Sequence, residues 1–230
     1  MRDMNFMHIP RTGGSSIEAT IKSHRTMRWR VRDCCRWSRN LVTCCKQGSP
    51  WHLPLDVLAL RDATLVKEFK TRPIWCIVRS PVERWASSIS FIANTRARWS
   101  GSLAFPRPQR SAQQLKAAFS CGRFRTEWDE ELAHMQPQSW MVWDALGSPQ
   151  CSCAVPFEQL SAFTSLRLNS RKLPHGELRE VGVSFSMPQN MSDLYAEDME
   201  LWQNALRHPG PCYPLSSRGR PAFRRAATWG

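Results

Sequence analysis

The sequence predicts a three-layer α/β domain with a largely parallel central sheet. Two short apolar runs, residues 4–9 and 74–78, have the length and composition of buried strands. Each run is followed by a turn and then by apolar residues at helical spacing, which is the order of a strand–turn–helix unit. Because alternating strands and helices favour a parallel sheet covered on both faces, we expect one such sheet at the centre of the domain.

The chain of 230 residues is long enough for one domain with a modest extension, and we expect that domain over residues 1–208. A basic, cysteine-rich stretch without clear periodicity predicts an irregular insertion over residues 24–50. Prolines, glycines and four arginines predict a flexible basic tail over residues 209–230. No apolar run is long enough for a membrane span, so we predict none in this chain.

The remaining elements follow from local patterns. Residues 15–23 predict a helix with Ile17 and Ile21 on one face, and residues 50–60 predict a loop that leads into an apolar segment. The helix expected over 81–93 has an apolar stripe of Val82, Trp85, Ala86, Ile89 and Ile92. Further helices are expected over 112–119, 127–135, 158–166 and 192–206, the last capped by Ser192, and short strands over 139–143 and 154–157.

The charge is strongly positive and unevenly distributed. There are 32 lysines and arginines against 19 aspartates and glutamates, a net charge of +13. Residues 1–50 carry ten basic and three acidic side chains, and the last 24 residues carry five basic and none acidic. The excess is mostly arginine, which holds phosphate, sulfate and carboxylate groups bidentately. The charge indicates either a polyanionic or phosphate-rich ligand, or simply a solvated basic surface.

The nine cysteines leave the redox compartment open. The vicinal pairs Cys34-Cys35 and Cys44-Cys45 lack the two-residue gap of a zinc knuckle. Free buried thiols and one or two disulfides remain equally compatible with the odd count. We therefore predict no metal site from the cysteines.

The most informative segment is the turn after the first expected strand. It reads His8-Ile-Pro-Arg11-Thr12-Gly13-Gly14-Ser15-Ser16. The two glycines let the backbone turn and approach a ligand closely, and the N–H groups of residues 12–16 then point toward one spot. Such a nest binds anions, while Arg11 adds a positive charge and Thr12, Ser15 and Ser16 add hydroxyl donors. A plain polar turn before a capped helix is the alternative.

A second polar turn follows the second expected strand, in Val78-Arg79-Ser80-Pro81-Val82-Glu83-Arg84-Trp85-Ala86-Ser87. Ser80, Pro81 and Glu83 match a capping box, which explains the helix start without any function. Capping does not explain Arg79, which lies at the carboxyl end of the strand, where ligands bind in parallel sheets. We expect Arg79 and Ser87 to converge on a second phosphate, although surface ion pairs would give a similar pattern.

Together the two turns, HIPRTGGSS and VRSPVERWASS, resemble the two donor-binding signatures of sulfotransferases that use 3′-phosphoadenosine 5′-phosphosulfate (PAPS). The chain is most similar to the Golgi carbohydrate sulfotransferase family, including its uronyl and heparan 2-O-sulfotransferase relatives. Later segments resemble further elements of that family in the same order over residues 4–206: Met135-Gln-Pro-Gln138, Pro156-Phe-Glu-Gln-Leu160, Leu173-Pro-His175 and Leu194-Tyr-Ala-Glu-Asp198.

The resemblance implies a fold like that of the P-loop nucleotide kinases. It also implies that PAPS is the donor, with its 5′-phosphosulfate on residues 11–16 and its 3′-phosphate held by Arg79 and Ser87. Two positions differ from the family pattern, since Arg11 replaces the usual lysine and Ser80 the usual aspartate. The acceptor implied is a hydroxyl group on a carbohydrate, and no nucleic-acid partner is expected. The sequence does not predict the oligomeric state.

Sulfuryl transfer needs in-line placement and neutralised charge on the leaving group, as phosphoryl transfer does. We expect Arg11 and the loop N–H groups to stabilise the leaving phosphate, with no metal ion. The acceptor needs a base, and His52 is the candidate because it lies between the two donor motifs, where the family often carries a histidine. His8 is expected to be structural or to support the residues that touch the substrate, and His175 and Glu158 are weaker candidates for roles in acceptor binding or in structure. The basic loop at 97–111 is a candidate wall for the acceptor.

Two other functions remain open at this point. A P-loop-like nucleotide kinase has similar topology, but the Walker lysine and a magnesium carboxylate are not visible in the sequence. A degenerate, non-enzymatic polyanion-binding module would use the basic ends of the chain. By resemblance the protein is expected at the Golgi membrane or lumen, or in the cytosol if Met1 is the genuine start.

Overall fold

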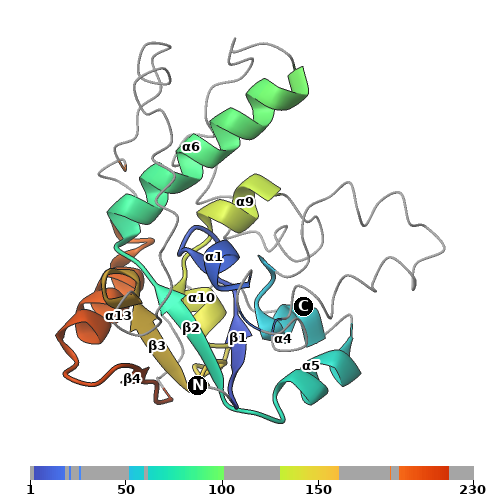
Figure 1. Ribbon diagram of the computed structural model, residues 1–230, viewed down its shortest axis with the longest axis vertical. Coiled ribbons are helices and arrows are strands. Elements are labelled where there is room, and N and C mark those ends of the chain that lie inside the picture. Colours follow the sequence, from blue (N-terminus) through green and yellow to red (C-terminus); the bar gives the residue numbers. More distant parts are fainter. Residues whose placement is uncertain are drawn as a thin grey trace.

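Four strands form one open sheet in the order β1-β2-β3-β4 (Figure 1). Strands β1 (Asn5–Met7), β2 (Ile74–Val78) and β3 (Cys153–Pro156) are parallel, and β4 (Tyr213–Pro214) is antiparallel to β3. The computed structural model describes residues 3–18, 21, 26, 52–59, 62–100, 130–160, 187 and 192–217, with the side chains of 93–100 and 130–132 left aside.

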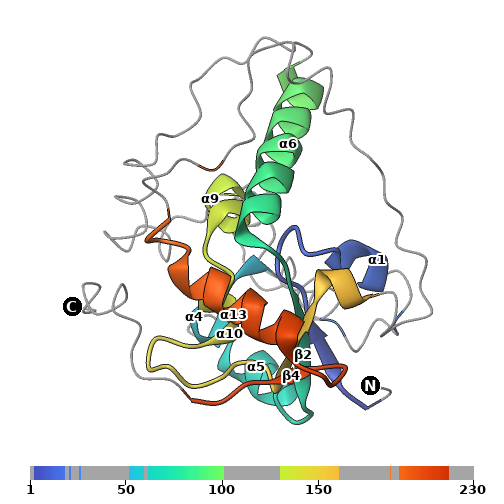
Figure 2. The same ribbon diagram turned by 90° about the vertical axis from the view of Figure 1, so that its left-hand side faces the viewer.

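Helices pack on both faces of this sheet (Figure 2). Alternate strand residues, such as Met7, Cys76 and Ala154, face one hydrophobic cluster, while Phe6 and Trp75 face another. The larger cluster includes side chains from α4 (Leu55–Ala59), α5 (Ala63–Phe69), α10 (Ser139–Val142) and α13 (Ala196–Arg207). The smaller one is covered by α1 (Gly14–Glu18) and by the residues around the 3₁₀ helix η4 (Phe157–Gln159).

The expected mixed α/β class and the largely parallel sheet are confirmed. The strands predicted over 4–9, 74–78 and 154–157 correspond to β1, β2 and β3. The long helix α6 (Pro81–Ser100) begins at the predicted proline and contacts α9 (Glu130–Met135). These elements were predictable because short apolar runs and helix-start signals are local features of the sequence.

The strand predicted over residues 139–143 is wrong, because Ser139–Val142 forms α10 and only Trp143, which follows the helix, is extended. All four residues of α10 are buried, so their apolar run shows no periodicity that separates a strand from a helix. A side chain distant in the sequence stabilises the start of the helix. The Asp198 carboxylate accepts hydrogen bonds from the backbone N–H groups of Gln138 and Ser139, each at 2.8 Å, and so satisfies two donors at the start of this helix.

The predicted stripe of α6 is wrong at Val82, whose side chain is 46 % exposed. Trp85 and Ile89 are buried as expected, but Arg84 and Ser88 are buried beside them. The helix also continues through residues 97–100, which had been placed in a basic loop. The face that α6 buries is therefore partly polar, because it packs against backbone carbonyl groups as well as against apolar side chains.

The chain also differs from expectation in three other places. Residues 50–60 were expected to form a loop that leads into an apolar segment of unassigned structure; Leu55–Ala59 is helical, and the following helix α5 was not predicted. Helix α13 starts at Ala196, with Tyr195 rather than Ser192 at its N-cap position. The 3₁₀ helix η4 occupies the start of the helix expected over 158–166. The helix expected over 112–119 and most of the insertion over 24–50 lie outside the described residues.

The expected flexible tail begins as an ordered segment. Tyr213 pairs with Ala154 in β4, and the Leu215 N–H group donates to the Ser152 carbonyl at 3.0 Å. Cys212 forms a disulfide with Cys153 at the start of β3. Composition alone misses this attachment because its stability comes from pairing with a strand 59 residues away.

We expect reduction of the Cys153–Cys212 disulfide to lower the free energy of unfolding by about 4 kcal/mol, because the closed loop spans 59 residues. Urea denaturation of the wild type and of a Cys153→Ser/Cys212→Ser variant measures the loss. The buried free thiol Cys151 provides the control, since a Cys151→Ala variant should keep its sensitivity to reduction. A double variant as stable as the oxidised wild type would contradict the prediction.

Candidate functional site

The two predicted turns meet at the carboxyl ends of β1 and β2 (Figure 1). Thr26 forms a parallel bridge with Phe6 on one side of β1, while β2 pairs with β1 on the other side. The chain therefore leaves β1 toward one edge of the sheet and leaves β2 toward the other. A crevice between two strands whose connections diverge in this way is where open parallel sheets bind ligands.

The first turn is a tight loop with two residues in the left-handed region. Arg11 has φ 65° and Gly13 has φ 87°. A side chain on Gly13 would lie 2.8 Å from the Phe157 ring, so only glycine fits there. The Thr12 hydroxyl is buried and donates to the Ile9 carbonyl at 2.8 Å, which holds the turn.

The serines that follow the turn differ in their surroundings. Ser15 is exposed, whereas Ser16 is partly buried. The Ser16 N–H group donates to the Gly13 carbonyl at 3.1 Å, so one of the five N–H groups expected to face a ligand is used within the loop. The hydroxyl groups of Ser15 and Ser16 remain predicted ligand contacts.

Arg11 connects the first turn to the second. Its Nε and Nη2 atoms donate to the Ser87 hydroxyl on α6 at 3.1 and 3.0 Å, and its guanidinium lies 4.8 Å from the centre of the Phe91 ring. The sequence analysis had placed Arg11 and Ser87 at opposite ends of the donor. In the structure they are direct partners, which brings the two turns into one site.

Arg79 completes the connection from the second turn. Its Nη1 atom donates to the Arg11 carbonyl at 3.5 Å, and its guanidinium lies 4.6 Å from the centre of the same Phe157 ring that contacts Gly13. The Arg79 Nε atom pairs with the exposed carboxylate of Glu83 at 3.1 Å. The Gln138 side chain brackets the Arg79 backbone, accepting from its N–H group and donating to its carbonyl.

Arg84 is the buried arginine of the site. Its guanidinium is 2 % exposed and donates to the carbonyls of Pro10 at 3.0 Å and Gln136 at 2.7 Å. Asp198 lies 4.0 Å from Arg84 Nη1 and is fully buried. Arg84 therefore ties the first turn to the segment between α9 and α10, which is a structural role that the sequence analysis did not foresee.

The site carries excess positive charge. Burial, together with the neighbouring positive charges of Arg79 and Arg84, lowers the pKa of Arg11 to about 10. Within the described residues, the polar partners of Arg11 are neutral, whereas Arg79 and Arg84 each lie near one carboxylate. Among these residues, two carboxylates therefore lie near three guanidinium groups. An anion bound at Arg11 would balance the excess positive charge.

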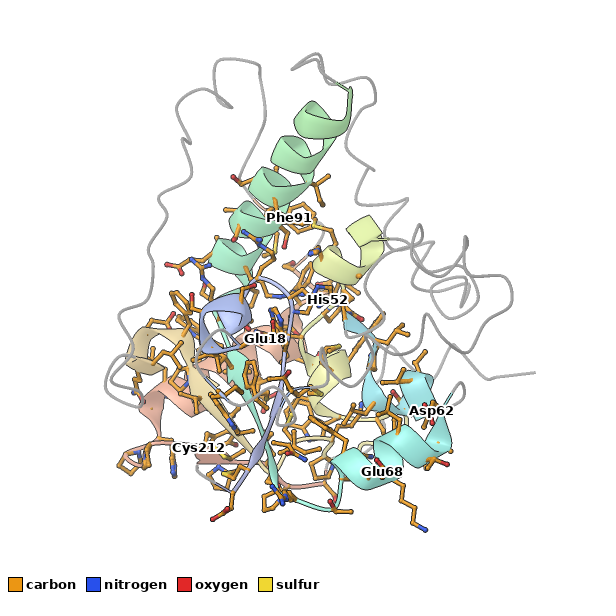
Figure 3. The ribbon with its side chains drawn as sticks, turned by 45° about the vertical axis from the view of Figure 1, so that its right-hand side comes forward. Glu18, His52, Asp62, Glu68, Phe91 and Cys212 are labelled. Atoms are coloured by element: carbon orange, nitrogen blue, oxygen red, sulfur yellow. A yellow bond between two sulfur atoms is a disulfide. The ribbon has the colours of Figure 1, made fainter. Side chains whose placement is uncertain are left out.

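Three histidines form a cluster next to Arg11. The rings of His8 and His52 are 5.2 Å apart edge to face, and those of His52 and His134 are 5.0 Å apart. His134 also stacks on Phe91 at 4.3 Å. Figure 3 shows Phe91 on α6 and His52 below it, to the right of α1, whereas Cys212 lies toward the other end of the sheet. The predicted base His52 is therefore beside the anion site, and its role stays a prediction.

We expect His134 to make the fold less stable in acid. Its ordinary pKa of 6.5 falls to about 3 because it is buried and close to Arg11, Arg84 and His8. Below pH 6.5 His134 is protonated in the unfolded chain but stays neutral in the folded chain. The free energy of unfolding therefore falls by about 1.4 kcal/mol per pH unit until the pH reaches the folded pKa. The free energy of unfolding, measured by urea denaturation, should therefore drop more steeply in the wild type than in His134→Gln. Parallel curves for the two proteins would contradict this assignment.

Sequence reasoning missed Phe91, His134 and Gln138. Phe91 follows Ser87 by one helical turn, so the spacing along α6 was an available signal. Gln138 lay in a segment selected for its family resemblance, but nothing local showed that it would bracket Arg79. Of the weaker candidates, Glu158 accepts from Trp202 Nε1 at 3.1 Å, and His175 and the acceptor loop from residue 101 on lie outside the described residues.

Comparisons with protein-family profiles, characterised proteins and solved structures found no match to this chain. Within the described ranges, no set of three or more His, Cys, Asp or Glu side chains is arranged to hold a metal ion. In the same ranges, no helix combines the length and apolar character needed to cross a membrane.

Proposed function

We propose that this protein is a sulfotransferase that moves a sulfuryl group from PAPS to a hydroxyl group of a carbohydrate. The observation that carries the proposal is the contact between the two donor-type turns: Arg11 reaches Ser87, and Arg79 reaches the Arg11 carbonyl. A donor with phosphate groups at both ends needs two cationic turns at one crevice. Adjacent parallel strands bring the two turns to one edge in any case, so the support comes from the cations that both turns place there.

The donor would lie across the carboxyl ends of β1 and β2. Its 5′-phosphosulfate would be held by the loop from Arg11 to Ser16, and its 3′-phosphate by Arg79 and Ser87. This assignment is supported by the charge of Arg11, near which no carboxylate is found among the described residues. Binding would require Arg11 to exchange part of its contact with Ser87 for a charged oxygen, which is a stronger hydrogen-bond acceptor than a hydroxyl.

The transfer itself needs a positioned acceptor and a stabilised leaving group. Arg11 would neutralise the charge that develops on the 5′-phosphate oxygen as its bond to sulfur breaks. The acceptor hydroxyl must lose its proton, and the histidine cluster beside Arg11 supplies imidazole groups for that step. His52 is the member that the sequence predicts for it.

We further propose that the sheet is part of a three-layer, P-loop kinase-like fold. The parallel bridge of Thr26 on the outer side of β1 supports this, because it makes β1 an inner strand. A Golgi lumen location is proposed from the resemblance. The Cys153–Cys212 disulfide supports it, since disulfides persist in oxidising compartments.

Calorimetry with 3′-phosphoadenosine 5′-phosphate (PAP), the desulfonated donor, tests the proposal. We expect PAP to bind and to prevent most binding of radiolabelled PAPS, and ATP with Mg²⁺ to bind far more weakly. Preferential binding of ATP with Mg²⁺ would instead favour a nucleotide kinase. Salt-sensitive heparin binding that survives Arg79→Ala, without PAP binding, would favour a polyanion-binding module. Incubation with radiolabelled PAPS and a panel of desulfated glycosaminoglycans then tests the transfer and identifies the acceptor.

A further inference from the structure

His8 has an environment that a purely structural histidine does not require. It follows β1 directly, is 6 % exposed, and its Nδ1 atom lies 3.2 Å from the Glu18 carboxylate. Glu18 is itself only 4 % exposed. The two atoms are in close electrostatic contact without the alignment of a full hydrogen bond. A carboxylate next to Nδ1 favours the tautomer in which that nitrogen carries the proton.

The other nitrogen of His8 faces the anion loop. A side chain on Gly14 would lie 2.1 Å from His8 Cδ2 and 2.5 Å from His8 Nε2, so the imidazole occupies the space that a Cβ atom would need. Gly14 was expected to let the backbone approach a ligand. In the structure it makes room for His8, and Nε2 has no hydrogen-bond partner among the described residues.

The charges around His8 come from every element packed against it. Glu18 of α1 is the carboxylate in direct contact, and His52 lies edge to face with the ring. The buried His134 is electrostatically coupled to His8 and also to Arg11 and Arg84, so these two guanidinium groups lie near the same histidine cluster. Glu18 is therefore placed to stabilise a positive charge that forms on His8 among other cationic groups.

We propose that His8 is the proton acceptor of the transfer reaction, with Glu18 as its positioning residue. This inference rests on the proposed sulfotransferase function. The acceptor O–H proton passes to His8 Nε2 while the acceptor oxygen forms a bond to sulfur. The bond between sulfur and the 5′-phosphate oxygen breaks, and the phosphate keeps the electron pair. The imidazolium, stabilised by Glu18, later releases its proton to water.

Single-turnover transfer from PAPS to desulfated heparan sulfate and chondroitin tests the assignment, with PAP affinity measured on the same proteins. We expect His8→Gln to lower the transfer rate by about 100-fold and to leave PAP affinity within about threefold, because the lost group acts on the acceptor. Glu18→Gln should lower the rate by at least about tenfold. The partly buried His208, which follows α13 and contacts Tyr213 outside the two turns, provides the matched control, since His208→Gln should transfer at the wild-type rate.

Two outcomes separate this inference from the proposed function. A wild type that neither binds PAP nor transfers sulfate would overturn both. A wild type that does both, while His8→Gln keeps its rate and His52→Gln loses it, would overturn the role of His8 alone and favour His52.

A second measurement covers the case in which His8→Gln does not fold. Imidazole ¹⁵N NMR of the unmutated protein in mildly alkaline buffer reports the tautomer of His8 directly. We expect the proton on Nδ1, and a shift toward Nε2 in Glu18→Gln. A wild-type His8 that carries its proton on Nε2 would overturn the proposal, because that nitrogen could not then accept a proton.

Discussion

Arg11→Ala is expected to weaken PAP binding by about 100-fold or more. Charge-assisted hydrogen bonds contribute about 1.5–3 kcal/mol each, and Arg11 has two donors, Nε and Nη2, directed at the second turn. Removing them would also break the contact with Ser87 that joins the two half-sites. Isothermal calorimetry at fixed ionic strength measures the change in affinity.

Arg207→Ala is the matched control for net charge. Arg207 is near the end of α13, where its contacts are with Gln203 and Asn204 of its own helix. Because it removes the same charge away from the two turns, it should leave PAP affinity within about twofold. Equal losses of PAP affinity in both variants would show that PAP binding depends only on the overall positive charge. That result would contradict the two-turn site.

Arg84→Met is expected to lower the free energy of unfolding by about 3–5 kcal/mol. The substitution leaves the buried carboxylate of Asp198 without its cation and leaves the carbonyls of Pro10 and Gln136 without their donor. Burial already raises the pKa of Asp198, in opposition to Arg84. Urea denaturation monitored by tryptophan fluorescence gives the loss directly.

A double variant and a surface variant make this result specific. Arg84→Met/Asp198→Asn should be destabilised by less than the sum of its two single variants, because the second change removes the charge that the first leaves unpaired. Glu83→Gln, one residue away on the exposed face of α6, should change stability by no more than about 0.5 kcal/mol. An Arg84→Met protein as stable as Glu83→Gln would refute the structural role of Arg84.

Much of the candidate site was predictable from the sequence. Strand β2 is a short apolar run, and Pro81 marks the start of α6. The Gly13-Gly14 pair marks a tight turn whose backbone conformation favours glycine. Each signal acts between residues close in the chain, so local chemistry is enough to read it. The expectation that both turns would share one edge followed from a general rule about parallel strands.

The partners of the site residues were not predictable in the same way. Nothing local in the sequence indicates that Arg84 is among the most buried side chains, where the carbonyl groups of Pro10, His134 and Gln136 accept its hydrogen bonds. Residues 139–143 have an apolar pattern that suits a strand. Ser139–Val142 is helical instead, and a carboxylate about 60 residues later in the chain accepts hydrogen bonds from the N–H groups at the start of this helix.

The positions of the two turns, and the cations and glycines that they carry, can be read from the amino-acid sequence, since they depend on neighbouring residues and on backbone freedom. Folding alone establishes that Arg11 contacts Ser87, that His8 lies between Gly14 and Glu18, and that Cys153 pairs with Cys212. Most of these contacts join residues far apart in the chain. They arise when the sheet and its covering helices pack, and no local pattern encodes them.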